Sequence, residues 1–201
     1  MKVIGLAGWS GAGKTTLISK LLPALVAQGL RVSTIKHAHH AFDLDKPGKD
    51  SWVHRQSGAS EVLIASGRRW ALMHELRDEA EPDLLDLLDR LARTDLVLVE
   101  GFKSEPYPKI EIHRVANGKP ALFPHDPCIV GLVTDGAVAS KIPTADLNDV
   151  RAITAMVLRL AVERDVLRKS IATSRGVAAD TKAIWQQTAD SDAMSEVDPA
   201  L

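Results

Sequence analysis

The chain has 201 residues, a formal net charge of −1 and an apolar fraction of 45%. This length favours a single domain, and a charge so close to zero excludes the strong field typical of proteins that bind nucleic acid or anionic membranes. Cys128 is the single cysteine, which excludes a disulfide framework and a cysteine-based metal site and fits a reducing cytoplasm.

The first 37 residues predict one βαβ unit. Residues 3–6 form a short apolar run typical of a buried parallel strand. A helical pattern begins at Lys14, and Gly29 marks its end. Residues 31–37 predict the second strand. No apolar run approaches the roughly 18 residues that a membrane span needs, and no signal peptide is evident, so we expect a soluble, cytoplasmic protein.

Strands and helices continue to alternate along the rest of the chain. The expected elements are a polar loop at 38–50, a short helix at 51–58, a β-hairpin with the arms EVLIA and RWALM, an amphipathic helix at 81–93, a buried strand at 96–99, a second, partly exposed hairpin where KIEIHRV precedes Asn117-Gly118, a buried strand at 128–133 and a helix at 149–164. This order predicts an α/β fold, with a mostly parallel sheet covered by helices on both faces and inserted hairpins.

The last part of the chain has a different composition. After about residue 170 the pattern fades into small, polar and weakly acidic residues, which are more typical of a tail than of a core element. We therefore expect a domain at 1–168 and a polar C-terminal tail at 169–201 that is not a separate domain.

The stretch GWSGAGKTT, residues 8–16, matches the phosphate-loop pattern G-x-x-x-x-G-K-[ST]. Glycine lets the backbone amides turn inward around a phosphate, and the helix that follows directs its positive dipole end at the same anion. In this pattern Lys14 reaches the β- and γ-phosphates and the Thr15 hydroxyl binds Mg²⁺. A predicted strand before the loop and a predicted helix after it supply the context that the pattern requires.

A phosphate loop needs an acidic partner at the carboxyl end of a buried strand, where it holds Mg²⁺ or its waters. Glu100 ends the strand at 96–99, whereas Asp95 lies at the wrong end of the same strand. A carboxylate there is costly unless it is paired or bound to a metal. We expect Glu100 to face the nucleotide, and the alternative is a plain acid at a strand end.

The segment at 36–51, KHAHHAFDLDKPGKDS, also emerges at the carboxyl edge of the sheet, where α/β proteins bind ligands. Its histidines, aspartates and lysines are compatible with a metal site, a switch or a second anion site, and also with a solvated loop. His37 and His40 have a spacing compatible with a metal, but neither a helix nor a cysteine supports a structural zinc.

The identity of the base is less clearly indicated. Guanine offers two neighbouring donors that one carboxylate can accept together. Asp135 follows the strand at 128–133 and is the candidate acceptor, with a plain Asp-Gly turn as the alternative. The asparagine-lysine-x-aspartate signature of common GTPases is absent from the sequence, and chemistry alone does not exclude ATP.

Three stretches together resemble the MobB family, the molybdopterin-guanine dinucleotide biosynthesis adapter proteins. They are GLAGWSGAGKTTL at the start, STIKHAHHAFDLDKPGKDSWVHRQSGA at 33–59 and DLVLVEGFK at 95–103. The middle stretch is much more specific than the phosphate loop, which many unrelated proteins share. The resemblance covers about residues 1–165.

The resemblance implies a GTP-binding P-loop protein with at most weak GTPase activity, which acts beside the guanylyltransferase that joins GMP to molybdopterin. It also implies a homodimer, for which the apolar arms of the first hairpin are suitable. Molybdopterin, or the molybdenum cofactor, is then a further ligand, bound by this chain or only by its partner. The positions expected to bind GTP are Ser10, Gly11, Ala12, Gly13, Lys14, Thr15, Thr16, His37, Asp45 and Asp135, with Thr15 and Glu100 holding Mg²⁺.

A small-molecule kinase on the same loop is the alternative function. Kinases close a lid whose arginines neutralise the transferred phosphoryl group, but the only adjacent arginine pair, Arg68-Arg69, lies in a predicted hairpin turn. A GTPase switch needs a side chain that orients the attacking water, and neither a glutamine nor an arginine is evidently in place. We therefore expect slow turnover.

Overall fold

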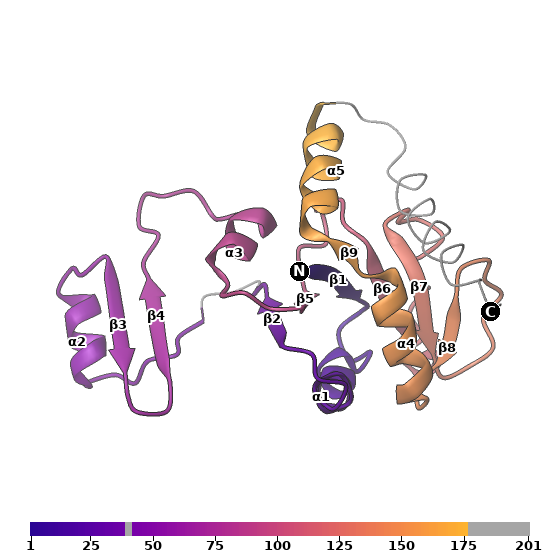
Figure 1. Ribbon diagram of the computed structural model, residues 1–201, viewed down its shortest axis with the longest axis horizontal. Helices are drawn as coiled ribbons and strands as arrows, with labels where there is room; N and C mark the ends of the chain where they lie inside the picture. The colour runs from indigo at the N-terminus through magenta and orange to yellow at the C-terminus, as the bar shows by residue number, and fades with distance from the viewer. Residues whose placement is uncertain (39–41, 177–201) are drawn as a thin grey trace, which may run out of the picture. The chain divides into compact units, whose positions relative to one another are not determined.

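A computed structural model describes residues 1–38 and 42–176 of the chain (Figure 1). The described residues form two compact units: the larger contains Met1–His37 and the described part of the chain after Asp86, and the smaller contains the described residues between Ala38 and Asp86. No helix in the described part of the chain is long and apolar enough to cross a membrane.

The larger unit is built on a mostly parallel sheet. Six parallel strands lie in the order β2-β5-β1-β6-β7-β8, and β9 pairs antiparallel with β1. Their bounds are β1 Lys2–Ala7, β2 Val32–Lys36, β5 Leu96–Glu100, β6 Lys109–His113, β7 Ile129–Thr134, β8 Thr144–Asp146 and β9 Val162–Glu163. The predicted α/β class is confirmed, and the chain crosses back through helices as parallel strands require.

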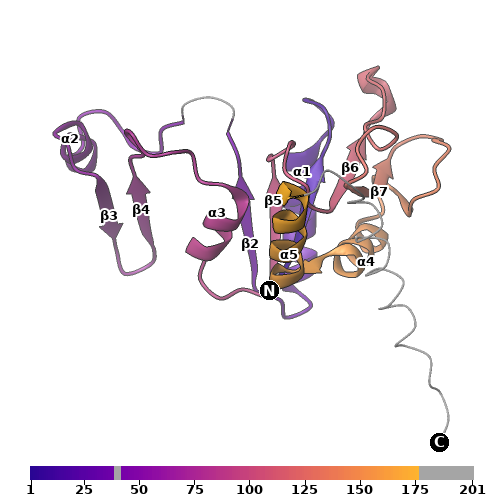
Figure 2. The same cartoon turned by 90° about the horizontal axis from the view of Figure 1, so that it is seen from above.

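Helices cover both faces of this sheet (Figures 1 and 2). Helices α1 (Lys14–Val26) and α4 (Val150–Leu160) pack on one face, where their leucines, isoleucine and valine join the even-numbered positions of β1 and β5 in an aliphatic core. Helix α5 (Arg164–Gly176) covers the other face through Leu167 and Ile171, both fully buried. Two short helices, α3 (Leu84–Arg90) and η1 (Val115–Asn117), lie in the connections.

The smaller unit contains helix α2 (Asp50–Gln56) and a two-stranded antiparallel sheet of β3 (Glu61–Ala65) and β4 (Trp70–His74). The predicted hairpin is present: its first arm coincides with EVLIA, and its second is displaced by one residue from RWALM. Most of its apolar side chains are exposed, and Val62 is the buried residue of the pair of strands.

The prediction of a second hairpin at KIEIHRV is wrong. These residues form β6, which lies inside the parallel sheet between β1 and β7. The alternation of polar and apolar residues in KIEIHRV does not mark an exposed strand, because Lys109 and Glu111 are buried and form hydrogen bonds inside the protein. The Lys109 ammonium donates to the carbonyls of Lys103 and Glu105, and the Glu111 carboxylate accepts the amides of Leu122 and Phe123 at 2.7 and 2.8 Å. A polar face was therefore mistaken for an exposed one.

The end of the larger unit also differs from the expected pattern. The helix predicted at 149–164 ends at Leu160 and is followed by β9 and α5, neither of which was predicted. Helix α5 continues across residue 168, and Ser170 and Ile171 on it are buried. Residues 169–176 of the predicted tail therefore belong to α5. The rest of the tail, from residue 177, lies outside the described residues, and its role stays a prediction.

Candidate functional site

The phosphate-loop motif joins the carboxyl end of β1 to the start of α1. Gly8, Gly11 and Gly13 have φ values of 143°, 80° and 92°, in the region that favours glycine. A Cβ on Gly8 would lie 2.5 Å from the carbonyl oxygen of Ile112 on β6, so the backbone of the loop passes directly over the sheet edge. Thr15 and Thr16 follow in the first turn of α1 and are exposed, as is Ser10. The amides of this turn have no helical acceptors and are available to an anion.

Lys14 extends back over the loop from the first position of α1. Its ammonium donates to the carbonyls of Gly8 at 2.8 Å and Trp9 at 3.1 Å. Burial lowers the pKa of this ammonium from 10.5; the Glu100 carboxylate opposes the shift, and the Lys103 and Lys36 ammonium groups add to it. The Glu100 carboxylate and the ammonium groups of Lys14, Lys36 and Lys103 are therefore close enough to act on one another at the carboxyl edge of the sheet.

The turn after β5 brings together two of the predicted site residues. Glu100 ends the strand half-buried, level with Leu6 on β1, and its carbonyl accepts the amide of His37 at 2.8 Å. A Cβ on Gly101 would lie 2.5 Å from Cβ of His37. Phe102 follows with φ of 49°, which is unusual for an aromatic residue, and stacks on the His37 ring with 4.6 Å between centroids. Backbone strain of this kind concentrates at functional sites.

The segment that follows β6 contacts the phosphate loop. Strands β5 and β6 flank β1 on opposite sides, so this segment and the Glu100 turn approach the loop from opposite sides of β1. The Asn117 side-chain amide donates to the carbonyl of Ser10 at 3.0 Å, and the Trp9 indole donates to the carbonyl of Pro120 at 2.8 Å. A Cβ on Gly11 would lie 3.1 Å from the Asn117 side-chain oxygen. The segment at 114–120 therefore holds the first half of the phosphate loop in place.

Asp135 is anchored to this same segment. One of its carboxylate oxygens accepts the amide of Val115 at 2.8 Å, and the other lies 3.7 Å from Nε of Arg114. Arg114 is partly exposed, and its Nη2 lies 3.6 Å from the position that a Cβ on Gly13 would take. The predicted guanine acceptor thus lies at the correct sheet edge, but it already binds a backbone amide. The sequence shows no arginine evidently in place beside the loop, whereas the structure has Arg114 next to Gly13.

Asp45 belongs to the smaller unit, where it takes part in a network of charges. Its carboxylate accepts the Ser51 hydroxyl at 2.7 Å and lies 3.8 Å from Nε of Arg55. Arg55 also pairs with Asp43 at 2.7 Å and with Glu75 at 3.2 Å. These contacts give Asp45 a local role in ordering the segment before α2, and its assignment to the nucleotide site stays a prediction.

The two side chains expected to hold Mg²⁺, Thr15 and Glu100, both offer oxygen atoms. Among residues 1–38 and 42–176, no group of three or more His, Cys, Asp or Glu side chains is arranged to hold a metal ion. His40, one member of the pair considered for zinc, lies outside the described residues. A Mg²⁺ ion commonly takes one or two protein oxygens and completes its shell with phosphate oxygens and waters, and the Thr15 hydroxyl and the Glu100 carboxylate fit that requirement.

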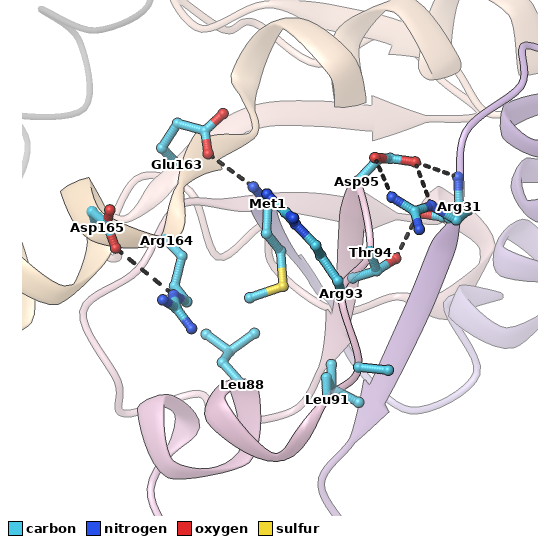
Figure 3. A pocket seen from close by; sticks show the side chains of 11 residues that line it. Met1, Arg31, Leu88, Leu91, Arg93, Thr94, Asp95, Glu163, Arg164 and Asp165 are labelled. Atoms are coloured by element: carbon cyan, nitrogen blue, oxygen red, sulfur yellow. Dashed lines mark hydrogen bonds and ion pairs between the residues drawn. The ribbon is translucent and has the colours of Figure 1, made fainter.

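A pocket of about 690 Å³ lies at the opposite, amino-terminal edge of the sheet (Figure 3). Around this pocket the amino group of Met1 pairs with Glu163 at 3.1 Å, Arg31 with Asp95 at 3.4 Å and Arg164 with Asp165 at 3.8 Å. Most charges of the pocket are therefore neutralised by neighbours. Because Asp95 precedes β5, it cannot serve the phosphate loop, as the sequence indicates.

Arg114, Asn117, Lys36 and Lys103 were not predicted as site residues. Arg114 and Asn117 were missed because β6 was taken for an exposed hairpin arm. Identified as a central parallel strand, β6 would have placed the residues that follow it at the carboxyl edge, beside the phosphate loop. Lys36 begins the polar segment at 36–51 and Lys103 ends the stretch at 95–103, but the sequence assigns neither a role of its own; the pairing of β2 with β5 brings both near Lys14.

Residues 3–135 match the family of molybdopterin guanine dinucleotide synthesis protein B, MobB. The chain belongs to the MobB family. The matched range contains the phosphate loop, the Glu100 turn, Arg114 and Asp135. The stretches by which the sequence resembles MobB therefore lie in one matched region, and that resemblance is confirmed.

Individual MobB proteins agree with this assignment. The chain is 43% identical over 159 residues to the molybdopterin-guanine dinucleotide biosynthesis adapter protein of Escherichia coli, covering 78% of this chain and 91% of that one. It is 50% identical over 118 residues to the Haemophilus influenzae protein of the same name, covering 59% and 66%. A crystal structure of molybdopterin-guanine biosynthesis protein B superimposes with a TM-score of 0.64 at 30% identity, covering 79% of this chain and 99% of that one.

Proposed function

We propose that this MobB-family adapter of molybdopterin guanine dinucleotide synthesis acts by binding GTP with Mg²⁺ at its phosphate loop. It then presents the nucleotide to the guanylyltransferase that joins GMP to molybdopterin. The observation that carries the proposal is the position of Lys14: its ammonium reaches back over the loop to the carbonyls of Gly8 and Trp9, where the Glu100 carboxylate acts on its pKa. The relatives are named adapter proteins, and no observation favours the kinase alternative.

Each part of the bound nucleotide has a proposed partner. The amides from Ser10 to Thr16 surround the phosphates together with the Lys14 ammonium, and Thr15 and Glu100 hold Mg²⁺, which neutralises phosphate charge when bound. His37 keeps the turn after Glu100 in place through its stacking on Phe102. These assignments are supported by the shared position of the groups at the carboxyl ends of β1, β2 and β5.

Guanine recognition is proposed for Asp135. Its carboxylate oxygens have lone pairs beyond those used by Val115 and Arg114, because each oxygen can accept two hydrogen bonds. It lies at the end of β7, two strands from the phosphate loop. Binding of both guanine donors there would distinguish GTP from ATP.

The hairpin of the smaller unit supports the proposal of a homodimer. In the register of β3 and β4, Leu63 lies opposite Leu72 and Ala65 opposite Trp70, so these side chains share one face. Leu63, Leu72 and Trp70 are exposed by 61%, 46% and 68%. An apolar face on a short two-stranded sheet is suited to pairing with a second copy of the chain. We place this dimer in the cytoplasm, with the guanylyltransferase and molybdopterin as its further partners.

Calorimetric titration with GTP and with ATP, each with Mg²⁺, tests the proposal. We expect clear preference for GTP, and slow release of phosphate in a turnover assay on the same sample. A preference for ATP, or transfer of phosphate to a small acceptor at several turnovers per second, would contradict the adapter function.

A further inference from the structure

We infer that Arg114 is a second phosphate-binding cation of this site, held over the phosphate loop by Asp135. The inference rests on the proposed binding of a nucleoside triphosphate and adds a residue to which no role has been given. It assigns to the turn after β6 a direct part in holding the ligand.

Two hydrogen bonds fix the turn after β6 against the phosphate loop. Asn117 donates to the carbonyl of Ser10 at 3.0 Å, and Trp9 donates to the carbonyl of Pro120 at 2.8 Å. The bonds run in opposite directions between the same two segments, so each segment fixes the other. The backbone at Arg114, three residues before Asn117, is consequently held near the loop.

The second step is the direction of the guanidinium. Nη2 of Arg114 lies 3.6 Å from the position that a Cβ on Gly13 would occupy. Gly13 is the residue before α1, so the cation lies beside the free amides of the first helical turn. A phosphate bound by those amides would lie within reach of the guanidinium, whose planar donors match phosphate oxygens in pairs.

The third step is the role of Asp135, a positioning residue. One oxygen fixes the backbone at Val115, and the other lies 3.7 Å from Nε of Arg114. Nε is thus in an ion pair with the carboxylate while Nη2 lies close to Gly13 of the loop. The Arg114 side chain is 43% exposed, so the guanidinium can adjust to an arriving anion without disturbing the core.

The fourth step is the distribution of charge around the loop. Lys14 is surrounded by Lys36, Lys103 and Glu100, which come from the β2 and β5 side of β1. Arg114 comes from β6, on the other side of β1. The phosphates are then flanked by a cation on each side, an arrangement suited to a polyphosphate rather than to a single small anion.

The test compares Arg114→Ala with Arg114→Lys by calorimetric titration with Mg²⁺·GTP and with inorganic triphosphate as a base-free probe. We expect Arg114→Ala to weaken binding of both probes by about tenfold or more and in the same proportion, because charge-assisted bonds to phosphate are lost. Arg114→Lys should recover part of the loss. The thermal unfolding midpoint should stay unchanged, which a merely structural role would not allow.

Arg93→Ala is the matched control, because Arg93 is an exposed arginine of the pocket at the opposite edge of the sheet (Figure 3). It should bind both probes like the wild type. If the wild type binds GTP, Lys14→Ala does not, and Arg114→Ala stays within about twofold of the wild type, the inference is overturned and the proposed function stands. Equal losses in Arg114→Ala and Arg114→Lys with a lower unfolding midpoint would also overturn it. A wild type that binds no GTP would overturn both.

Discussion

Lys14 is held by two carbonyls in an environment that disfavours its charge. Burial and the neighbouring Lys103 and Lys36 lower its pKa from 10.5, against the opposing effect of Glu100. The ammonium therefore loses its proton at a lower pH than an ordinary lysine, and an arriving phosphate, being an anion beside it, should raise the pKa again. Ligand binding and the proton on Lys14 are thus coupled.

This coupling predicts the direction of a titration. In the chain labelled with ¹³C at lysine Cε, the Lys14 signal, assigned by its loss in Lys14→Ala, should titrate with a midpoint below 10.5. Addition of Mg²⁺·GTP should move the midpoint upward. A midpoint at or above 10.5 in the free chain, or a downward shift on binding, would contradict the account.

Asp135 gives a second prediction at the scale of the residue. If its carboxylate accepts the guanine donors, Asp135→Ala should bring the ratio of GTP to ATP affinity close to one. If the carboxylate serves only Val115 and Arg114, both affinities should fall together and the ratio should persist. We expect the ratio to fall, and competition titrations with the two nucleotides on one sample measure it. A persistent ratio would mean that guanine is recognised elsewhere.

Among the elements of the site, the turn after β5 is tightly constrained. Gly101 has φ of 109° and its missing Cβ would collide with His37 at 2.5 Å. We predict that Gly101→Ala lowers the free energy of unfolding by about 1–3 kcal/mol. The displaced turn should also move Glu100, so the dependence of GTP binding on Mg²⁺ should weaken.

Gly29→Ala is the control for this change. Gly29 also has positive φ, 83°, but a Cβ there would meet nothing within 4 Å. It therefore carries the backbone strain without the collision. Denaturant unfolding and titration at several Mg²⁺ concentrations should show some loss of stability in Gly29→Ala and an unchanged Mg²⁺ dependence. The same Mg²⁺ dependence in both variants would show that the Gly101 turn does not position Glu100.

Elements with an unambiguous apolar pattern could be predicted from the sequence. Strands β1, β5 and β7 are continuous apolar runs because helices cover both faces of the sheet, and α1 and α4 repeat their leucines and isoleucines at helical spacing. The phosphate loop, Lys14 and Glu100 followed from these elements. They could be placed because the carboxyl ends of parallel strands meet at one edge.

The remainder could not be predicted because tertiary contacts decide it. Strand β6 contains Lys109 and Glu111, whose burial is tolerated through partners in the loops before and after the strand. Strand β8 has three residues, too few for a pattern. Helix α5 buries Leu167 and Ile171 on an otherwise polar helix. Arg114 was missed for the same reason as β6: a residue that follows an exposed hairpin arm is not expected to lie at the phosphate loop.

At the scale of the whole molecule, the chain divides its expected roles between two units. The phosphate loop, the Glu100 turn and Arg114 belong to the larger unit, and the apolar hairpin belongs to the smaller one. With a net charge of −1, attraction of the nucleotide depends on the local cations at the sheet edge rather than on the overall field. Binding and self-association should therefore respond to different substitutions.

This separation predicts the behaviour of a hairpin variant. Leu63→Glu places a charge in the exposed apolar face and should convert the proposed dimer to a monomer without weakening GTP binding. Val26→Glu is the control, since Val26 is an exposed apolar residue on α1 of the larger unit. Light scattering at micromolar concentration measures the mass. A wild type with the mass of one chain would contradict the dimer.

The central claim is that the chain binds GTP through its phosphate loop, and titration of the wild type and of Lys14→Ala with Mg²⁺·GTP tests it most directly. Circular dichroism confirms that both chains are folded. We expect saturable binding by the wild type at micromolar concentration and no detectable binding by Lys14→Ala. A wild type that does not bind GTP, or a Lys14→Ala variant that binds it as tightly as the wild type, would contradict binding through the phosphate loop.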